Sequence, residues 1–150
     1  MKYLLQLGLL AAYLLFAAGG VRAQTVVCKG PQDACARASD AVRLFVALHA
    51  RDLGAVADGW RFVLLDADGW ARITETFREQ VHLEKITGSA FTVAAIRTTY
   101  INLAWFSAQF PSRQLETVTH ELAHIAGCGR EEACARAETR RRLEMLGAMK

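Results

Sequence analysis

The sequence lacks the features that divide a chain into separate parts. Its 150 residues contain only two prolines. No internal repeat, low-complexity stretch or Pro-rich linker interrupts them. Long linkers between domains are commonly rich in proline or in small polar residues. At this length one domain can bury a genuine core, so we expect a single domain.

The chain also lacks a strong excess of charge of either sign. Lys and Arg together number 18, and Asp and Glu 15, which gives a formal net charge of +3. Proteins that bind nucleic acid need a dense positive surface to neutralise phosphates, so this balance argues against nucleic acid as the main partner. We interpret the C-terminal arginine cluster as the solvated face of the last helix. The cluster consists of Arg136, Arg140, Arg141 and Arg142.

A long apolar run occurs only at the N-terminus, where Lys2 precedes a run over residues 3–18 that is broken only by Gln6 and Gly8, and Ala23 ends a small-residue segment. This order is typical of a signal peptide over residues 1–23, cleaved after Ala23, followed by one mature domain over 24–150. The mature chain of 127 residues would carry a net charge of +1. The alternative is an uncleaved anchor, because the run is nearly long enough to span a bilayer. We expect an exported protein, periplasmic or secreted, with no stable membrane insertion after cleavage.

Export would place the four cysteines in an oxidising compartment, where disulfides form. Four cysteines allow three pairings, and sequence alone does not choose among them. We favour the local pairs, Cys28 with Cys35 and Cys128 with Cys134. A cysteine zinc site is the alternative, although neither spacing is as short as in a zinc finger.

The chemistry of the sequence centres on the pentapeptide His120-Glu121-Leu122-Ala123-His124. Two imidazoles at positions i and i+4 of a helix project from one side and can share a metal ion. A carboxylate beside the first histidine can accept a proton from water at that metal. The alternative is a surface helix with two solvated histidines.

Hydrophobic periodicity predicts a helix from Arg113 to Ala126, with Ser112 as its N-cap and Gly127 just beyond its end. The two histidines lie on the side opposite its apolar face, with Glu121 on the flank. One sector of about 100° holds the apolar residues, namely Leu115, Val118, Leu122, Ile125 and Ala126.

A catalytic zinc needs three protein ligands, and no His or Asp follows His124. A metzincin would place its third His at position 130, but Arg130 cannot ligate a cation. On the last helix, residues 131–146, Glu132 shares the predicted buried side with Ala135, Thr139, Leu143 and Leu146. We therefore favour Glu132 over Glu131. Two alternatives stay open: Glu131 as the ligand, or Glu132 paired with Arg136 one turn later.

The remaining segments predict a small α+β domain with an N-terminal helix and a small, mostly antiparallel sheet. We expect a lead-in over 24–29, a helix over 33–53 with His49 partly exposed, and a strand over 60–65. A turn at 66–69 and a return strand at 70–73 follow. Residues 74–85 predict a short helix capped at Thr76, or an extension of that strand. Strands are expected over 90–95 and 98–106.

Residues 99–127, TYINLAWFSAQFPSRQLETVTHELAHIAG, and 131–138, EEACARAE, resemble the core of gluzincin metallopeptidases. The pattern is closest to the IrrE/ImmA-like group, and the resemblance covers about a third of the chain. The matching residues are Ile101-Asn102, Thr117, His120, Glu121, His124 and Glu132-Ala133. The resemblance implies a small zincin-like domain with zinc held by His120, His124 and Glu132.

We therefore expect a secreted zinc-dependent metallopeptidase in which Glu121 acts as general base. A further donor would stabilise the oxyanion, with Tyr100, His82 and Arg140 as candidates. A strand at 90–95 or 100–106 would bind a peptide or protein substrate through its backbone. The alternatives are a non-catalytic scaffold that binds zinc or a partner, and a hydrolase of cell-wall amides.

Overall fold

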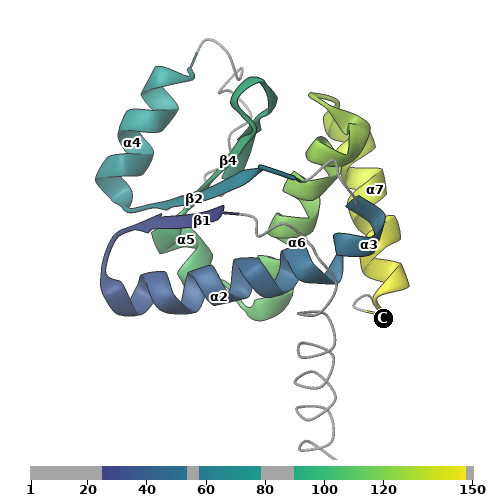
Figure 1. The fold of residues 1–150 in the computed structure, drawn as a ribbon, viewed down its shortest axis with the longest axis horizontal. Helices are drawn as coiled ribbons and strands as arrows, with labels where there is room; N and C mark the ends of the chain where they lie inside the picture. Colours follow the sequence, from purple (N-terminus) through teal and green to yellow (C-terminus); the bar gives the residue numbers. More distant parts are fainter. Residues whose placement is uncertain (1–24, 54–57, 79–89, 148–150) are drawn as a thin grey trace, which may run out of the picture.

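The computed structural model describes residues 25–53, 58–78 and 90–147 as an α+β fold (Figure 1). The expected signal peptide and His82 lie outside the described residues. A four-stranded sheet with the order β1-β2-β4-β3 forms the centre of the fold. Its strands are β1 (Thr25–Lys29), β2 (Arg61–Leu65), β3 (Ala90–Val93) and β4 (Thr98–Asn102).

The expectation of a mostly antiparallel sheet is wrong, because the sheet is mixed. β1 pairs with β2 and β2 with β4 in parallel, and only β3 runs antiparallel, against β4. Parallel neighbours need a crossover connection, which α2 (Gln32–Leu48) provides between β1 and β2. The segment expected as a lead-in is therefore a strand, β1.

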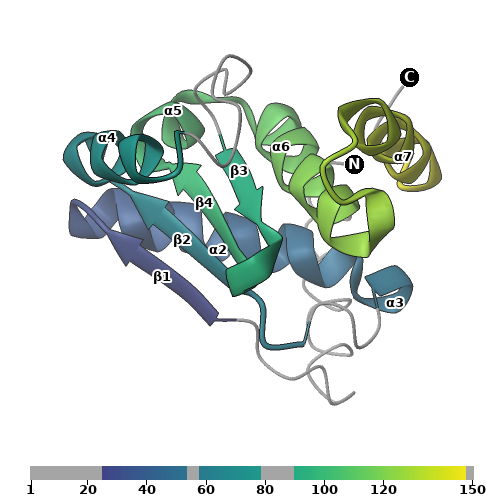
Figure 2. The same ribbon diagram turned by 90° about the horizontal axis from the view of Figure 1, so that it is seen from above.

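Helices lie on both faces of the sheet. Figure 2 shows α2 behind the strands, α4 (Ala67–Thr76) in front of them and α6 (Pro111–Ala123) beside β3. The other helical segments are α3 (Ala50–Leu53), the 3-10 turn η3 (Ala94–Ile96), α5 (Leu103–Ala108), the π-helical turn η4 (His124–Cys128) and α7 (Glu132–Met145). None of the helices in the described ranges has the length and apolar character needed to cross a bilayer.

The segment after β2 is helical, so the return strand predicted at 70–73 is wrong. The side chain of Asp66 accepts a hydrogen bond from the Gly69 amide at 2.8 Å and caps the first turn of α4. α4 ends at Thr76, where sequence reasoning started a helix. An Asp side chain that accepts a hydrogen bond from the amide three residues later is found both in turns and at helix N-termini. The sequence therefore did not distinguish a turn from the start of α4.

The strand predicted over 98–106 stops at Asn102. The Asn102 side chain accepts a hydrogen bond from the Trp105 amide at 3.1 Å and caps α5. The preceding strand β4 and the following helix α5 therefore share the apolar run that sequence reasoning assigned to one strand.

The main core fills the space between one face of the sheet and the helices α2, α5 and α6. Its fully buried members include Val42, Phe62, Leu64, Ile101, Phe106, Val118 and Leu122. His49 lies in this core with 2 % of its surface exposed, so its expected partial exposure is wrong. Its Nε2 lies 3.0 Å from the Thr119 hydroxyl, which ties the end of α2 to α6.

Both disulfides predicted from local spacing are present. Cys28–Cys35 joins β1 to α2, and Cys128–Cys134 joins the π-helical turn to α7. The predicted pairing is confirmed.

Candidate metal centre

α6 carries the two histidines of the motif and packs against the core through its apolar face. It begins with Pro111 at N1 after Phe110, so Ser112 lies inside the first turn and the predicted Ser112 cap is wrong. Proline suits N1 because its fixed φ matches the helix and this position needs no amide hydrogen bond. Val118 and Leu122 are fully buried, whereas His120 and His124 are partly exposed, as the helical wheel predicts.

The chain leaves α6 through an unusual turn. The α-helix ends at Ala123, and His124–Cys128 continues as one π-helical turn. Gly127 at φ 137° and Gly129 at φ 56° reverse the chain in a backbone region that favours glycine. The Cys128–Cys134 disulfide then holds α7 against this turn. Glu132, the first residue of α7, is therefore brought back beside the histidines.

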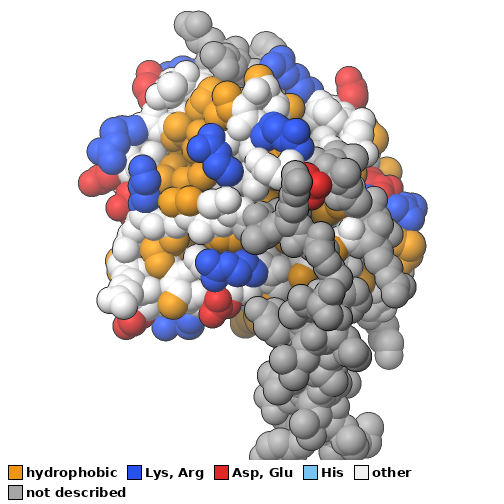
Figure 3. Space-filling model, viewed as in Figure 1, with side chains coloured by type: hydrophobic (Ala, Val, Ile, Leu, Met, Phe, Trp, Pro, Cys, Tyr) orange, Lys and Arg blue, Asp and Glu red, His pale blue; other side chains and the backbone are white. Residues whose placement is uncertain are grey.

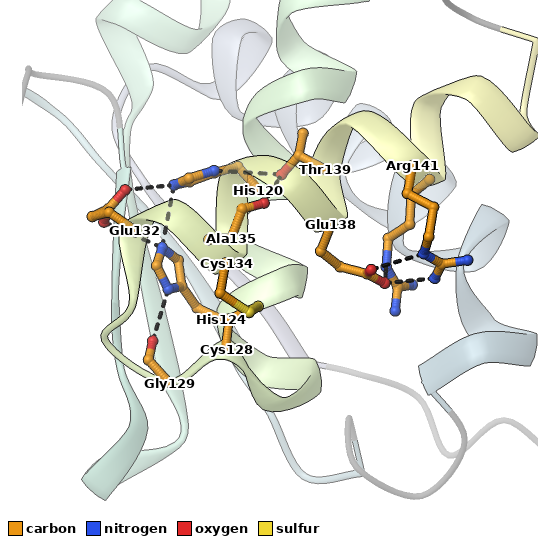
Figure 4. Close-up of a disulfide and its surroundings, with 11 residues drawn as sticks. His120, His124, Cys128, Gly129, Glu132, Cys134, Ala135, Glu138, Thr139 and Arg141 are labelled. Carbon is orange, nitrogen blue, oxygen red and sulfur yellow. Dashed lines mark hydrogen bonds and ion pairs between the residues drawn. A yellow bond between two sulfur atoms is a disulfide. The ribbon is translucent and has the colours of Figure 1, made fainter.

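Three side chains converge at this point (Figure 4). The Nε2 atoms of His120 and His124 lie 3.2 Å apart. Glu132 Oε2 lies 3.3 Å from His120 Nε2, and Glu132 Oε1 lies 3.4 Å from His124 Nε2. Ligand atoms around a tetrahedral zinc with bonds of about 2.0–2.1 Å are separated by about 3.3–3.4 Å. The group formed by His120, His124 and Glu132 could therefore hold a metal ion.

The tautomer of His124 is set by its other nitrogen. His124 Nδ1 lies 2.7 Å from the carbonyl oxygen of Gly129, which can only accept a hydrogen bond. Nδ1 therefore carries the proton, and in the neutral ring Nε2 keeps a free lone pair. The turn after α6 that positions Glu132 therefore also orients His124 so that its Nε2 can bind a metal ion.

His120 is oriented in a similar way by α7. Its Nδ1 lies 3.4 Å from the Thr139 hydroxyl, which donates its own proton to the Ala135 carbonyl at 2.6 Å. The hydroxyl oxygen can then only accept, so His120 donates from Nδ1 and its Nε2 keeps the lone pair. Thr139 is buried, and sequence reasoning placed it on the inner side of α7 without assigning it this role.

The electrostatics of the cluster favour a bound cation. Burial lowers the pKa of His120, and the adjacent His124 lowers it further, although Glu132 acts in the opposite direction. When both imidazole rings are neutral, their Nε2 lone pairs and the Glu132 carboxylate face one another, and no proton is shared between them. Such acceptors repel one another unless a cation lies between them. The donor set fits a divalent metal that prefers nitrogen and oxygen ligands.

Glu132 is less buried than predicted, with 42 % of its side chain exposed. Its carboxylate also lies 3.9 Å from Arg136, so the alternative, pairing with Arg136 one turn later, coexists with the histidine contacts. The Arg136 side chain is 68 % exposed, and exposed ion pairs of this kind contribute little. Glu131 is exposed at the N-cap of α7, outside the group of three ligands.

Glu121 points from α6 toward the sheet, with 4 % of its surface exposed. Its Oε2 accepts a hydrogen bond from the Thr92 hydroxyl of β3 at 2.7 Å. Burial raises the pKa of Glu121 to about 7, the Thr92 hydrogen bond opposes this shift, and the charge of Glu132 adds to it. A carboxyl group with this pKa can both take and give a proton near neutral pH.

A chain of hydrogen bonds supports Thr92 from within the sheet. The indole of Trp60 donates to the Thr99 hydroxyl at 3.1 Å, and the Thr99 and Thr92 hydroxyls lie 2.8 Å apart. Because the indole can only donate, Thr99 accepts from it and donates to Thr92, which in turn donates to Glu121. Sequence reasoning missed these residues, since Thr92 and Thr99 meet only through the pairing of β3 with β4.

Of the suggested oxyanion stabilisers, Tyr100 lies on the face of the sheet opposite Glu121. Tyr100 follows Thr99 in β4 and faces the other side of the sheet, with its ring 5.2 Å from that of Phe91 and 5.9 Å from that of Phe77. Arg140 is exposed on α7, and His82 lies outside the described residues.

No protein-family model, curated protein or solved structure matches this chain. The choice among functions therefore depends on the chemistry of the site.

Proposed function

We propose that the protein is a secreted zinc-dependent metallopeptidase with a zincin-like domain of the gluzincin type. One observation carries this proposal. The Nε2 atoms of His120 and His124 and the Glu132 carboxylate converge at 3.2–3.4 Å while both Nδ1 protons are directed elsewhere. Zinc prefers such mixed nitrogen and oxygen ligands, and three protein ligands leave a position for water.

When bound, zinc would polarise a scissile carbonyl and lower the pKa of a water molecule toward neutrality. In that setting Glu121 would take a proton from the attacking water and return it to the leaving amine. Before any metal is bound, burial raises the pKa of Glu121 to about 7, which supports a role in proton transfer. Thr92 fixes the carboxylate through Oε2 and leaves Oε1 available for the reaction.

The arrangement of the sheet supports a peptide as substrate. β4 has neighbours on both sides, whereas β3 has β4 as its single neighbour among the described strands. β3 also supplies Thr92, which contacts Glu121, so this strand borders the site. An extended peptide that pairs with the edge of β3 that no described strand occupies would pass beside Glu121.

The two disulfides fit an oxidising compartment. Together with the apolar segment at the N-terminus they support export as part of the proposal.

The test is metal analysis and peptide hydrolysis with the exported protein. We expect about one zinc per chain, cleavage of an unfolded protein substrate, loss of cleavage with a chelator and recovery with zinc. Glu121→Gln should keep zinc and lose hydrolysis, whereas Glu132→Ala should lose zinc. Full turnover by Glu121→Gln would refute its role as base. Cleavage of peptidoglycan fragments alone would assign the site to cell-wall amides, and zinc binding without any hydrolysis would leave a scaffold.

A further inference from the structure

A cavity lies on the face of the sheet away from the metal centre. It has a volume of about 390 Å³ and lies between α4 and the strands β1, β2 and β4. Cavities of about 300–1,000 Å³ are typical of small-molecule sites. Along β4, Tyr100 lines this cavity whereas its neighbour Thr99 takes part in the hydrogen-bond chain to Glu121. The cavity and the metal centre therefore occupy opposite faces of the sheet.

The floor of the cavity is apolar. Val27 of β1 and Val63 of β2 are register partners, so their side chains lie next to each other on this face. Leu65 and, from α4, Ile73 extend the same surface. Val27 is 37 % exposed, which leaves apolar area open to a ligand. Such a floor suits an aliphatic or aromatic body.

The cavity is also lined by three cations, Lys29 of β1, Arg61 of β2 and Arg72 of α4. No Asp or Glu is among the described residues that line it. In the described part of the chain, no carboxylate lies within ion-pair distance of these cations, in contrast to Arg43, Arg78 and Arg113, which have such partners. Figure 3 shows hydrophobic side chains bordered by Lys and Arg on this side, between α4 and the strands.

The positions of the cations define the shape of the ligand. Arg61 pairs in register with Thr25, and Lys29 pairs with Leu65, so the two cations are four residues apart along parallel strands. This separation is about 13 Å at the usual rise of about 3.3 Å per residue. Val27 and Val63 lie between them. Arg61 donates to the Thr98 hydroxyl at 3.3 Å, which holds its guanidinium beside the cavity.

We propose that this cavity binds a small amphiphilic carboxylate, of the chemical class of a medium-chain fatty acid. The acyl chain lies over the apolar floor, and the carboxylate forms charge-assisted hydrogen bonds with Arg61, Arg72 or Lys29. The volume and the mixed lining favour such a ligand over an acidic peptide, which would need a longer surface and little apolar floor. This inference is independent of the proposed hydrolysis.

The test is a displacement titration on the full protein. The fluorescent probe anilinonaphthalene sulfonate has an aromatic body and an anionic group, so it should occupy the cavity. Dodecanoate below its micellar concentration should displace it, whereas acetate and dodecyltrimethylammonium should not, because one lacks the chain and the other the negative charge. Displacement by an oligoglutamate peptide but not by dodecanoate would overturn the proposal in favour of an acidic peptide.

Charge reversal locates the site. Arg72→Glu and Lys29→Glu should each weaken dodecanoate binding at least tenfold. The matched control is Arg37→Glu, an exposed arginine of α2 on the other side of the sheet, which should change binding by less than twofold. Equal binding by all three variants would overturn the proposal.

A second measurement does not depend on variants. Dodecanoate should shift the amide resonances of Val63, Gly69 and Thr76 in the wild-type protein, and leave those of α7 unchanged. Shifts confined to α6 and α7 would place the ligand at the metal centre and overturn the proposal.

Discussion

The hydrogen bond from Thr92 to Glu121 offers a sharp test of how the fold would tune the proposed general base. The hydroxyl stabilises the ionised carboxylate and thus lowers its pKa, against the effect of burial. Thr92→Val keeps the shape of the side chain and removes this donor. A hydrogen bond to a charged group contributes about 1.5–3 kcal/mol, and about 1.4 kcal/mol corresponds to one pH unit. The pKa of Glu121 should therefore rise by about 1–2 pH units in the variant.

The assay is the pH dependence of kcat/KM for peptide hydrolysis. Because the base must be ionised, the acidic limb of the profile should move to higher pH in Thr92→Val, and activity should recover on the alkaline side. Thr92→Ser retains the hydroxyl and should keep the wild-type profile. A uniform loss of activity with an unmoved limb would show that Thr92 has only a structural role, and would refute this reasoning.

Three further predictions concern the metal, the disulfide and stability. Glu132→Ala should weaken zinc binding at least a hundredfold by equilibrium dialysis, whereas the exposed neighbour variant Glu131→Ala should bind zinc normally. Replacing Cys128 and Cys134 by Ser should lower the free energy of unfolding by about 2 kcal/mol, as closure of so short a loop implies, measured by urea titration. In the chelated protein, the raised pKa of Glu121 stabilises the fold below the ordinary pKa near 4.5, and this stability is lost as pH rises through about 7. Glu121→Gln should therefore become more stable relative to wild type across this window, and a constant difference would contradict the assigned pKa.

The parts of the site predicted from sequence are those held together within one or two helices. His120 and His124 share a face because of helical periodicity, and Glu132 follows from the same argument applied to α7. Both disulfides pair cysteines that are close in sequence, with separations of 7 and 6 residues. Local geometry decides all of these contacts, so a sequence pattern is sufficient to find them.

The parts that sequence reasoning missed depend on the register of the sheet. In the sequence Thr92 and Thr99 look like ordinary strand residues. The pairing of β3 with β4 in the folded sheet places their hydroxyls beside each other. β1 has only five residues, and none of them is fully buried in the structure, so it lacks the long apolar run of a central strand. Its parallel pairing with β2 follows from the crossover through α2, which no short window of sequence reveals.

The tight turn after α6 determines which local disturbances would impair metal binding and which would impair turnover. Among the described residues, the polar partners of the two imidazoles, from the Gly129 carbonyl to the Thr139 hydroxyl, fall within the twenty residues that begin at His120. The proton acceptor alone relies on a distant strand for its alignment. If the proposed function is correct, local unfolding at the edge of the sheet would stop turnover without releasing the metal, so assays of metal content and of turnover would report on separate regions of one small fold.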